Sequence, residues 1–96
     1  MTLAELRDSL GGTQPPPGLR GVLQALWHDA RGDWDEAHRI AQSIEDAEGA
    51  WVHAYLHRKE GDLGNASYWY SRAGKRRPDV PLEQEWGQIA AALLER

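Results

Sequence analysis

The sequence predicts an all-α protein of about six helices. Apolar residues recur three and four positions apart, as in Leu19, Val22, Leu23 and Leu26, which is the spacing of one face of a helix. Glycine, proline and capping residues divide the chain into six segments of this kind. No stretch alternates between apolar and polar residues for long enough to predict a strand.

The helices are predicted in the following order. Thr2 and Glu5 have the spacing of a capping box and predict a helix over 3–10, before a glycine pair. The proline run at 15–17 predicts an extended connector, because proline lacks the amide donor that a helix interior needs. Two helical hairpins follow at 18–45 and 46–78, and a last helix at 82–95. Because the turns are short, neighbouring helices should be antiparallel.

The helix ends are marked by side chains suited to those positions. Asp33, Asp46 and Asp62 each precede an apolar helical stripe and are predicted N-caps. Gly32 and Gly61 follow a helix, where a left-handed backbone conformation is easily adopted by glycine, and they are predicted C-terminal caps.

Length and composition limit the possible functions. The chain has 96 residues, which predicts one domain over 1–96 with a modest core. A net charge of −4 argues against duplex nucleic acid as the main partner. The absence of cysteine excludes disulfides, thiolate metal sites and cysteine nucleophiles. Neither a signal peptide nor a membrane span is predicted, so we expect a cytoplasmic protein.

The middle of the chain repeats with an offset of 29 residues. The repeat pairs small and turn residues of one hairpin with those of the next: Ala25 with Ala54, Gly32 with Gly61, and Ala37 with Ala66. His28 and His57 are paired by the same offset. Two copies of one helical hairpin must stack, because each has an apolar face that it cannot cover alone. The helices at 3–10 and 82–95 should then cap the stack.

These spacings resemble the tetratricopeptide repeat, a helix-turn-helix unit of about 34 residues. The resemblance covers roughly 18–78 and implies a right-handed stack of antiparallel hairpins. It also implies a non-catalytic module that binds a protein or peptide. The stretch from His57 to Tyr70 is similar to a segment of a small bacterial family, and this similarity implies no activity.

A binding groove is the leading functional prediction. In the repeat that the chain resembles, Trp51, Tyr55, Arg58 and Lys59 would face the concave side. Tyrosine and tryptophan beside arginine are typical of binding hot spots. The partner is a protein, a peptide or a second copy of the chain. Alternatively, the C-terminal helix folds over these residues and makes them part of the core.

The histidines offer a second hypothesis. His53 and His57 are four residues apart on one helix, a spacing that lets two imidazoles share a metal ion. Glu60 lies on the same side, and His28 is the repeat counterpart of His57. Zinc hydrolases with a His-Glu-x-x-His motif have a glutamate base where this chain has Ala54. The sequence therefore favours packing roles for the histidines, with a metal-binding protein or metal-dependent enzyme as the alternative.

No other catalytic constellation is present. The chain has no phosphate-binding loop with its lysine and hydroxyl residue, and no serine lies in a nucleophile elbow. The sequence thus predicts a protein that is not an enzyme and needs no cofactor.

Overall fold

The computed structural model describes residues 1–96 and consists of six helices without strands, which confirms the all-α prediction. The helices are α1 (Leu3–Ser9), α2 (Gly21–Ala30), α3 (Trp34–Ser43), α4 (Ala47–Glu60), α5 (Leu63–Ala73) and α6 (Leu82–Leu94). None of the six combines the length and the apolar composition that a membrane crossing requires.

Local capping sets the helix boundaries largely as predicted. Thr2 and Glu5 form a complete capping box at the start of α1. The side chains of Asp33, Asp46 and Asp62 each accept a hydrogen bond from the amide three residues further on. Gly32 and Gly61 both have a positive φ, of 85° and 90°. The predicted turn glycines therefore adopt the conformation that favours glycine.

One boundary differs from the periodicity. The apolar pattern begins at Leu19, but α2 begins at Gly21. The chain reverses at Gly18, where φ is +80°, and Arg20 is still extended at the N-cap position. Leu19 nevertheless lies in the core, because it packs inward from the segment before the helix.

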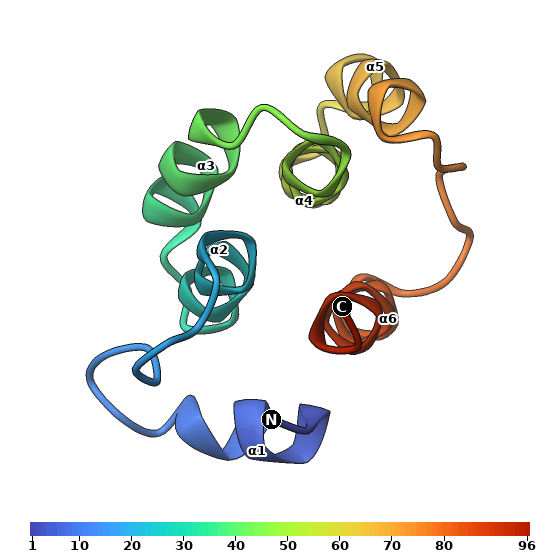
Figure 1. The fold of residues 1–96 in the computed structure, drawn as a ribbon. Coiled ribbons are helices and arrows are strands. Elements are labelled where there is room, and N and C mark those ends of the chain that lie inside the picture. Colours follow the sequence, from blue (N-terminus) through green and yellow to red (C-terminus); the bar gives the residue numbers. More distant parts are fainter.

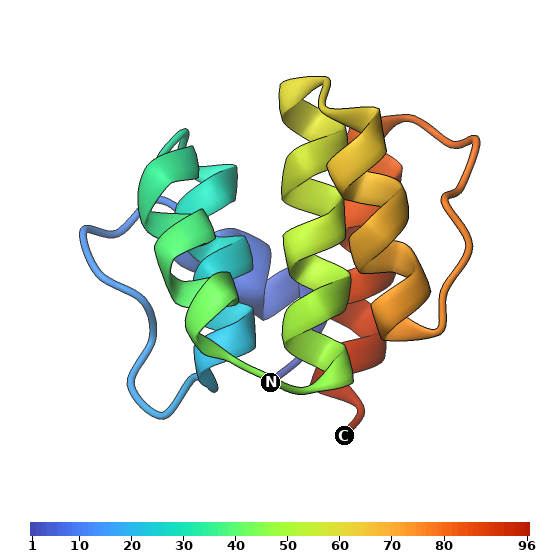
Figure 2. The same ribbon diagram turned by 90° about the horizontal axis from the view of Figure 1, so that it is seen from above.

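The helices are arranged around α4. In Figure 1, which looks nearly along several helix axes, α4 lies between α3 and α5, while α2 and α6 lie lower in the view. Figure 2 shows α2 beside α3 and α4 beside α5 as two helical hairpins. The main core lies between α1, α2, α4 and α6, and its largest fully buried apolar side chains are Leu6, Leu26, Trp27, Leu56, Ile89 and Leu93.

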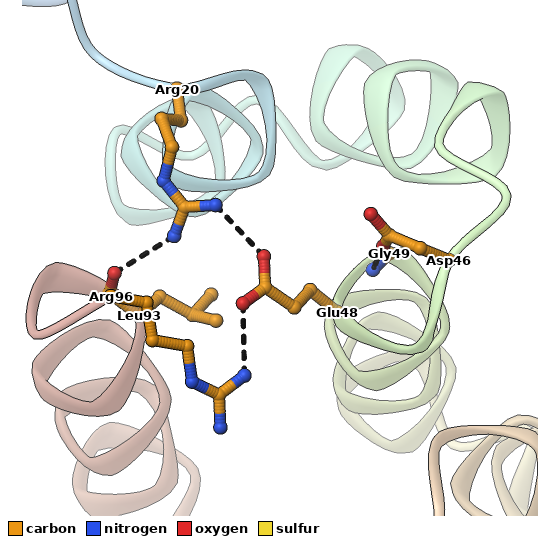
Figure 3. A network of polar contacts seen from close by, with 6 residues as sticks. All are labelled: Arg20, Asp46, Glu48, Gly49, Leu93 and Arg96. Carbon is orange, nitrogen blue, oxygen red and sulfur yellow. Dashed lines mark hydrogen bonds and ion pairs between the residues drawn. The ribbon is translucent and has the colours of Figure 1, made fainter.

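A polar network ties α6 to the starts of α2 and α4 (Figure 3). Arg20 donates to the Glu48 carboxylate at 2.8 Å and to the Leu93 carbonyl at 2.8 Å. Arg96 donates to the other Glu48 oxygen at 2.9 Å. The hydrogen bonds from Arg96 and Arg20 lower the pKa of Glu48. This network holds the C-terminal helix against the rest of the molecule.

Gly49 lets the backbone at the start of α4 pass close to the end of α3. A Cβ atom at this position would lie 2.1 Å from the carbonyl oxygen of Ile44, where no real Cβ is found. Asp46 accepts a hydrogen bond from the Gly49 amide at 2.8 Å, which fixes the turn that separates the two helices. The chain can therefore pack α4 tightly on the end of α3 only with glycine at position 49.

We predict that Gly49→Ala destabilises the protein by about 2 kcal/mol or more, because the methyl group displaces the Ile44 backbone. Gly64→Ala is the matched control, since a Cβ at position 64 meets only an Asp62 oxygen at 3.9 Å. This control should be neutral or stabilising by about 0.5–1 kcal/mol, because alanine is the better helix former. Urea unfolding of both variants measures the difference, and equal stabilities would contradict the contact.

Candidate metal centre

Three histidines, one from α3 and two from α4, meet where these two helices pack together. His38 lies on α3, and His53 and His57 lie one turn apart on α4. One ligand nitrogen from each ring lies within 4.8 Å of the other two. The Nε2 atoms of His38 and His53 are 3.0 Å apart. The close packing of α3 on α4 thus gathers three metal-ligating side chains into one cluster.

Two tryptophans enclose these rings. Trp34 on α3 stacks on His38, with ring centroids 4.8 Å apart and planes 9° from parallel. Trp69 on α5 stacks on His53 at 4.1 Å and 19°. The Trp34 indole also donates to the Leu56 carbonyl on α4 at 2.9 Å, which holds α3 against α4. The imidazoles are therefore positioned by neighbours on either side rather than free to rotate.

A carboxylate orients the third histidine. His57 Nδ1 lies 2.6 Å from Glu60 Oε1, and the side chain of His57 is only 12% exposed. When Nδ1 carries the proton and donates to Glu60, the Nε2 lone pair of His57 is left for a metal ion. A carboxylate behind a ligating histidine is the usual outer partner of such ligands. Glu60 and Asp62 are exposed beside this ring and place negative charge at the edge of the cluster.

The surroundings keep two of the rings neutral near pH 7. Burial, together with the neighbouring His38 and His57, lowers the pKa of His53 to about 4. Burial and the nearby His57 also lower the pKa of His38. Neutral imidazole is the form that binds metal, so the cluster does not have to lose protons from these two residues before it can act as a ligand set.

The donor set indicates the class of ion. Three imidazole nitrogens without sulfur suit zinc, copper or nickel, whereas calcium and magnesium prefer oxygen. Zinc sites with three protein ligands keep a fourth position for water or another small molecule. The arrangement of His38, His53 and His57 is of this three-ligand kind.

The sequence identified two members of this cluster and missed the third. His53, His57 and Glu60 come together as expected. His28, the repeat counterpart of His57, instead lies on α2 with its ring edge against Trp27 and joins no cluster of ligands. His38 takes the place that His28 was expected to fill. It could have been found from its position on the face of α3 that also carries Trp34, because residues four apart share a helix face.

The predicted groove residues are mostly engaged inside the molecule. Tyr55 is 2% exposed and donates to Asp29 at 2.9 Å. Arg58 pairs with the buried Glu85 of α6 at 2.7 Å. Tyr55 and Arg58 are therefore held by partners on α2 and α6, which favours the alternative in which the C-terminal helix packs over part of this face.

The other two predicted groove residues, Trp51 and Lys59, remain partly exposed to solvent. Lys59 pairs with Asp29 at 2.9 Å while 37% of its side chain stays exposed. Trp51 is half-buried beneath the Lys75 ammonium, which lies 4.3 Å from the indole centroid. The predicted small packing residues are all fully buried: Ala25, Ala37, Ala54 and Ala66.

The chain matches no family model, no curated protein and no solved structure. The fold and the site together define an all-α protein with a three-histidine cluster between two helical hairpins. A functional hypothesis must therefore rest on the chemistry of this histidine cluster.

We predict that metal-free protein loses stability as the pH falls from 6.5 toward about 4. In this window the unfolded chain protonates His53 and the folded protein does not, so the unfolded state binds more protons. The free energy of unfolding should fall by up to about 1.4 kcal/mol per pH unit for this one proton. Above pH 6.5 the His53 ring is neutral in both the folded and the unfolded chain, so it causes no loss of stability there.

Urea unfolding of metal-free protein between pH 7 and about pH 4.5 tests this prediction. His53→Gln should flatten the decline, and His28→Gln, outside the cluster, should preserve it. An unchanged pH dependence in His53→Gln would show that this ring does not couple folding to protons.

Proposed function

We propose that the protein binds a divalent transition-metal ion, of the zinc, copper and nickel class, through His38, His53 and His57. The observation that carries the proposal is the convergence of three imidazole nitrogens, with ligand atoms within 4.8 Å of one another. The chain has four histidines in all, and three of them gather at this one place.

The spacing of the nitrogens supports this proposal. A tetrahedral ion with metal–nitrogen bonds of about 2.0–2.1 Å holds its ligand nitrogens about 3.3 Å apart. The Nε2 atoms of His38 and His53 are already 3.0 Å apart. Without an ion, one of these nitrogens must donate a proton to the other. An ion would replace that shared proton and draw both lone pairs to itself.

The site also joins separate parts of the fold. His38 belongs to the first hairpin, α2–α3, and the other two ligands belong to the second, α4–α5. An ion bound to all three would clamp α3 to α4. Binding to the folded state alone stabilises a protein by mass action, so metal should raise the stability of this fold.

The interaction module predicted from the sequence stays a prediction. The burial of Tyr55 and the ion pair between Arg58 and Glu85 favour a structural role for those side chains. We therefore place metal binding ahead of peptide binding through that face.

Titration of chelator-treated protein with Zn²⁺ or Co²⁺ near pH 7.5 tests the proposal. We expect a stoichiometry of one ion per chain and a gain of about 2.7 kcal/mol in unfolding free energy at a free metal concentration of 100 times Kd. Bound Co²⁺ should also show the intense visible absorption of a four-coordinate nitrogen site. A chain that is neither stabilised nor coloured by metal would refute the proposal.

His28→Gln is the matched control for His38→Gln and His53→Gln. The control should bind metal like the wild type, because His28 lies outside the cluster. The other two variants should lose the metal-dependent gain while circular dichroism shows an intact helical fold. Equal losses in all three would indicate non-specific histidine binding and would contradict the assigned site.

We further predict that Glu60→Gln weakens metal binding about 10- to 100-fold without abolishing it. The carboxylate supports the imidazole of His57 by accepting its Nδ1 proton, and outer partners of this kind typically contribute that much affinity. Competition with a coloured chelator measures the change in Kd. Glu36→Gln, which removes an acid paired only with Arg39, should leave the affinity unaltered.

A further inference from the structure

A second candidate site lies on the opposite side of α4 from the histidines. A cavity of about 980 Å³ opens between α1, the ends of α2 and α4, and the start of α6. Its size lies within the range of pockets that hold small organic ligands. The apolar part of its wall consists of Leu10, Ala30, Pro81, Leu82 and Trp86.

A buried carboxylate lines this cavity. Asp29 is 2% exposed, and its two oxygens accept hydrogen bonds from Tyr55 and Lys59, both at 2.9 Å. The carboxylate is therefore neutralised within the protein. The Lys59 ammonium, which lines the cavity, has three donors and uses one of them on Asp29, so two have no acceptor within the protein.

A second cation lines the same cavity without a protein acceptor. The Arg7 guanidinium forms no ion pair or side-chain hydrogen bond, although the chain carries 15 acidic residues. It lies 5.8 Å from the centroid of the Trp86 ring and against the backbone of α6 at Gly87. The five N–H donors of the guanidinium therefore lie beside the indole, which is part of the apolar wall. Glu83, also on the lining, is exposed in the first turn of α6.

We propose that this cavity binds a small organic monocarboxylate. The apolar part of the ligand would lie against Trp86, Leu10 and Leu82. Its carboxylate would accept hydrogen bonds from Arg7 and Lys59, and guanidinium pairs bidentately with carboxylates. The charges of the lining favour a ligand with only one negative charge. Asp29 already neutralises Lys59, and the carboxylate of Glu83 would repel a second negative charge on the ligand. This inference is independent of the histidine cluster.

Ligand-observed NMR titration of the metal-free full chain tests the proposal with three molecules of equal length: hexanoate, hexanol and hexylamine. We expect saturable one-to-one binding of hexanoate with a Kd near the millimolar range, as befits so small a ligand. Hexanol should bind at least about tenfold more weakly, since it lacks the charge that Arg7 and Lys59 recognise. Equal binding of hexanoate and hexanol, tighter binding of hexylamine, or no saturation with hexanoate would each overturn the proposal.

Variants place the binding in this cavity. Arg7→Gln should weaken hexanoate about tenfold, and Ala30→Leu, which puts a larger side chain into the cavity, should weaken it at least as much. Arg39→Gln is the matched control, because Arg39 is an exposed arginine on α3 that pairs with Glu36. It should bind hexanoate like the wild type. Undiminished binding by both Arg7→Gln and Ala30→Leu, with circular dichroism unaltered, would exclude this cavity as the site.

Discussion

The contact between Gly49 and the Ile44 carbonyl is the constraint on which the candidate metal centre depends. A side chain at position 49 would enter the space of that oxygen, so the end of α3 and the start of α4 can meet closely only at a glycine. The same two helices carry the histidines: Nε2 of His38 on α3 lies 3.0 Å from Nε2 of His53 on α4, over a separation of 15 residues in the chain. The close turn at Gly49 and the two imidazoles thus belong to one tightly packed contact between α3 and α4.

The central helix supports two different surfaces because of its geometry. His53 and His57 lie on one face of α4, and Tyr55 and Lys59 lie two residues further along, which is about 200° around the helix axis. The first face meets α3 and α5, and the second meets α2 and α6 (Figure 1). Most of α4 is consequently buried, and its buried polar side-chain atoms all have hydrogen-bond partners within the fold.

The repeat in the sequence explains both the success and the error in the site prediction. The spacing of His53 and His57 correctly placed two rings together, because residues four apart on a helix share a face. The offset of 29 suggested His28 as their neighbour. Equivalent positions in two hairpins need not be adjacent, however, and His28 packs against Trp27 on α2. His38 has no periodic relation to the other two histidines, so the repeat did not point to it, although it shares a helix face with Trp34.

Most helix boundaries could be read from the sequence, because capping is local. Thr2, Asp33, Asp46 and Asp62 each bond to an amide three residues away, and Gly61 ends α4 with its own backbone conformation. Which helix faces are covered, by contrast, depends on tertiary packing. Tyr55 and Arg58 have the composition of a binding surface, but the buried carboxylates of Asp29 and Glu85 draw them inside. That outcome depends on how distant helices cross, which no local spacing specifies.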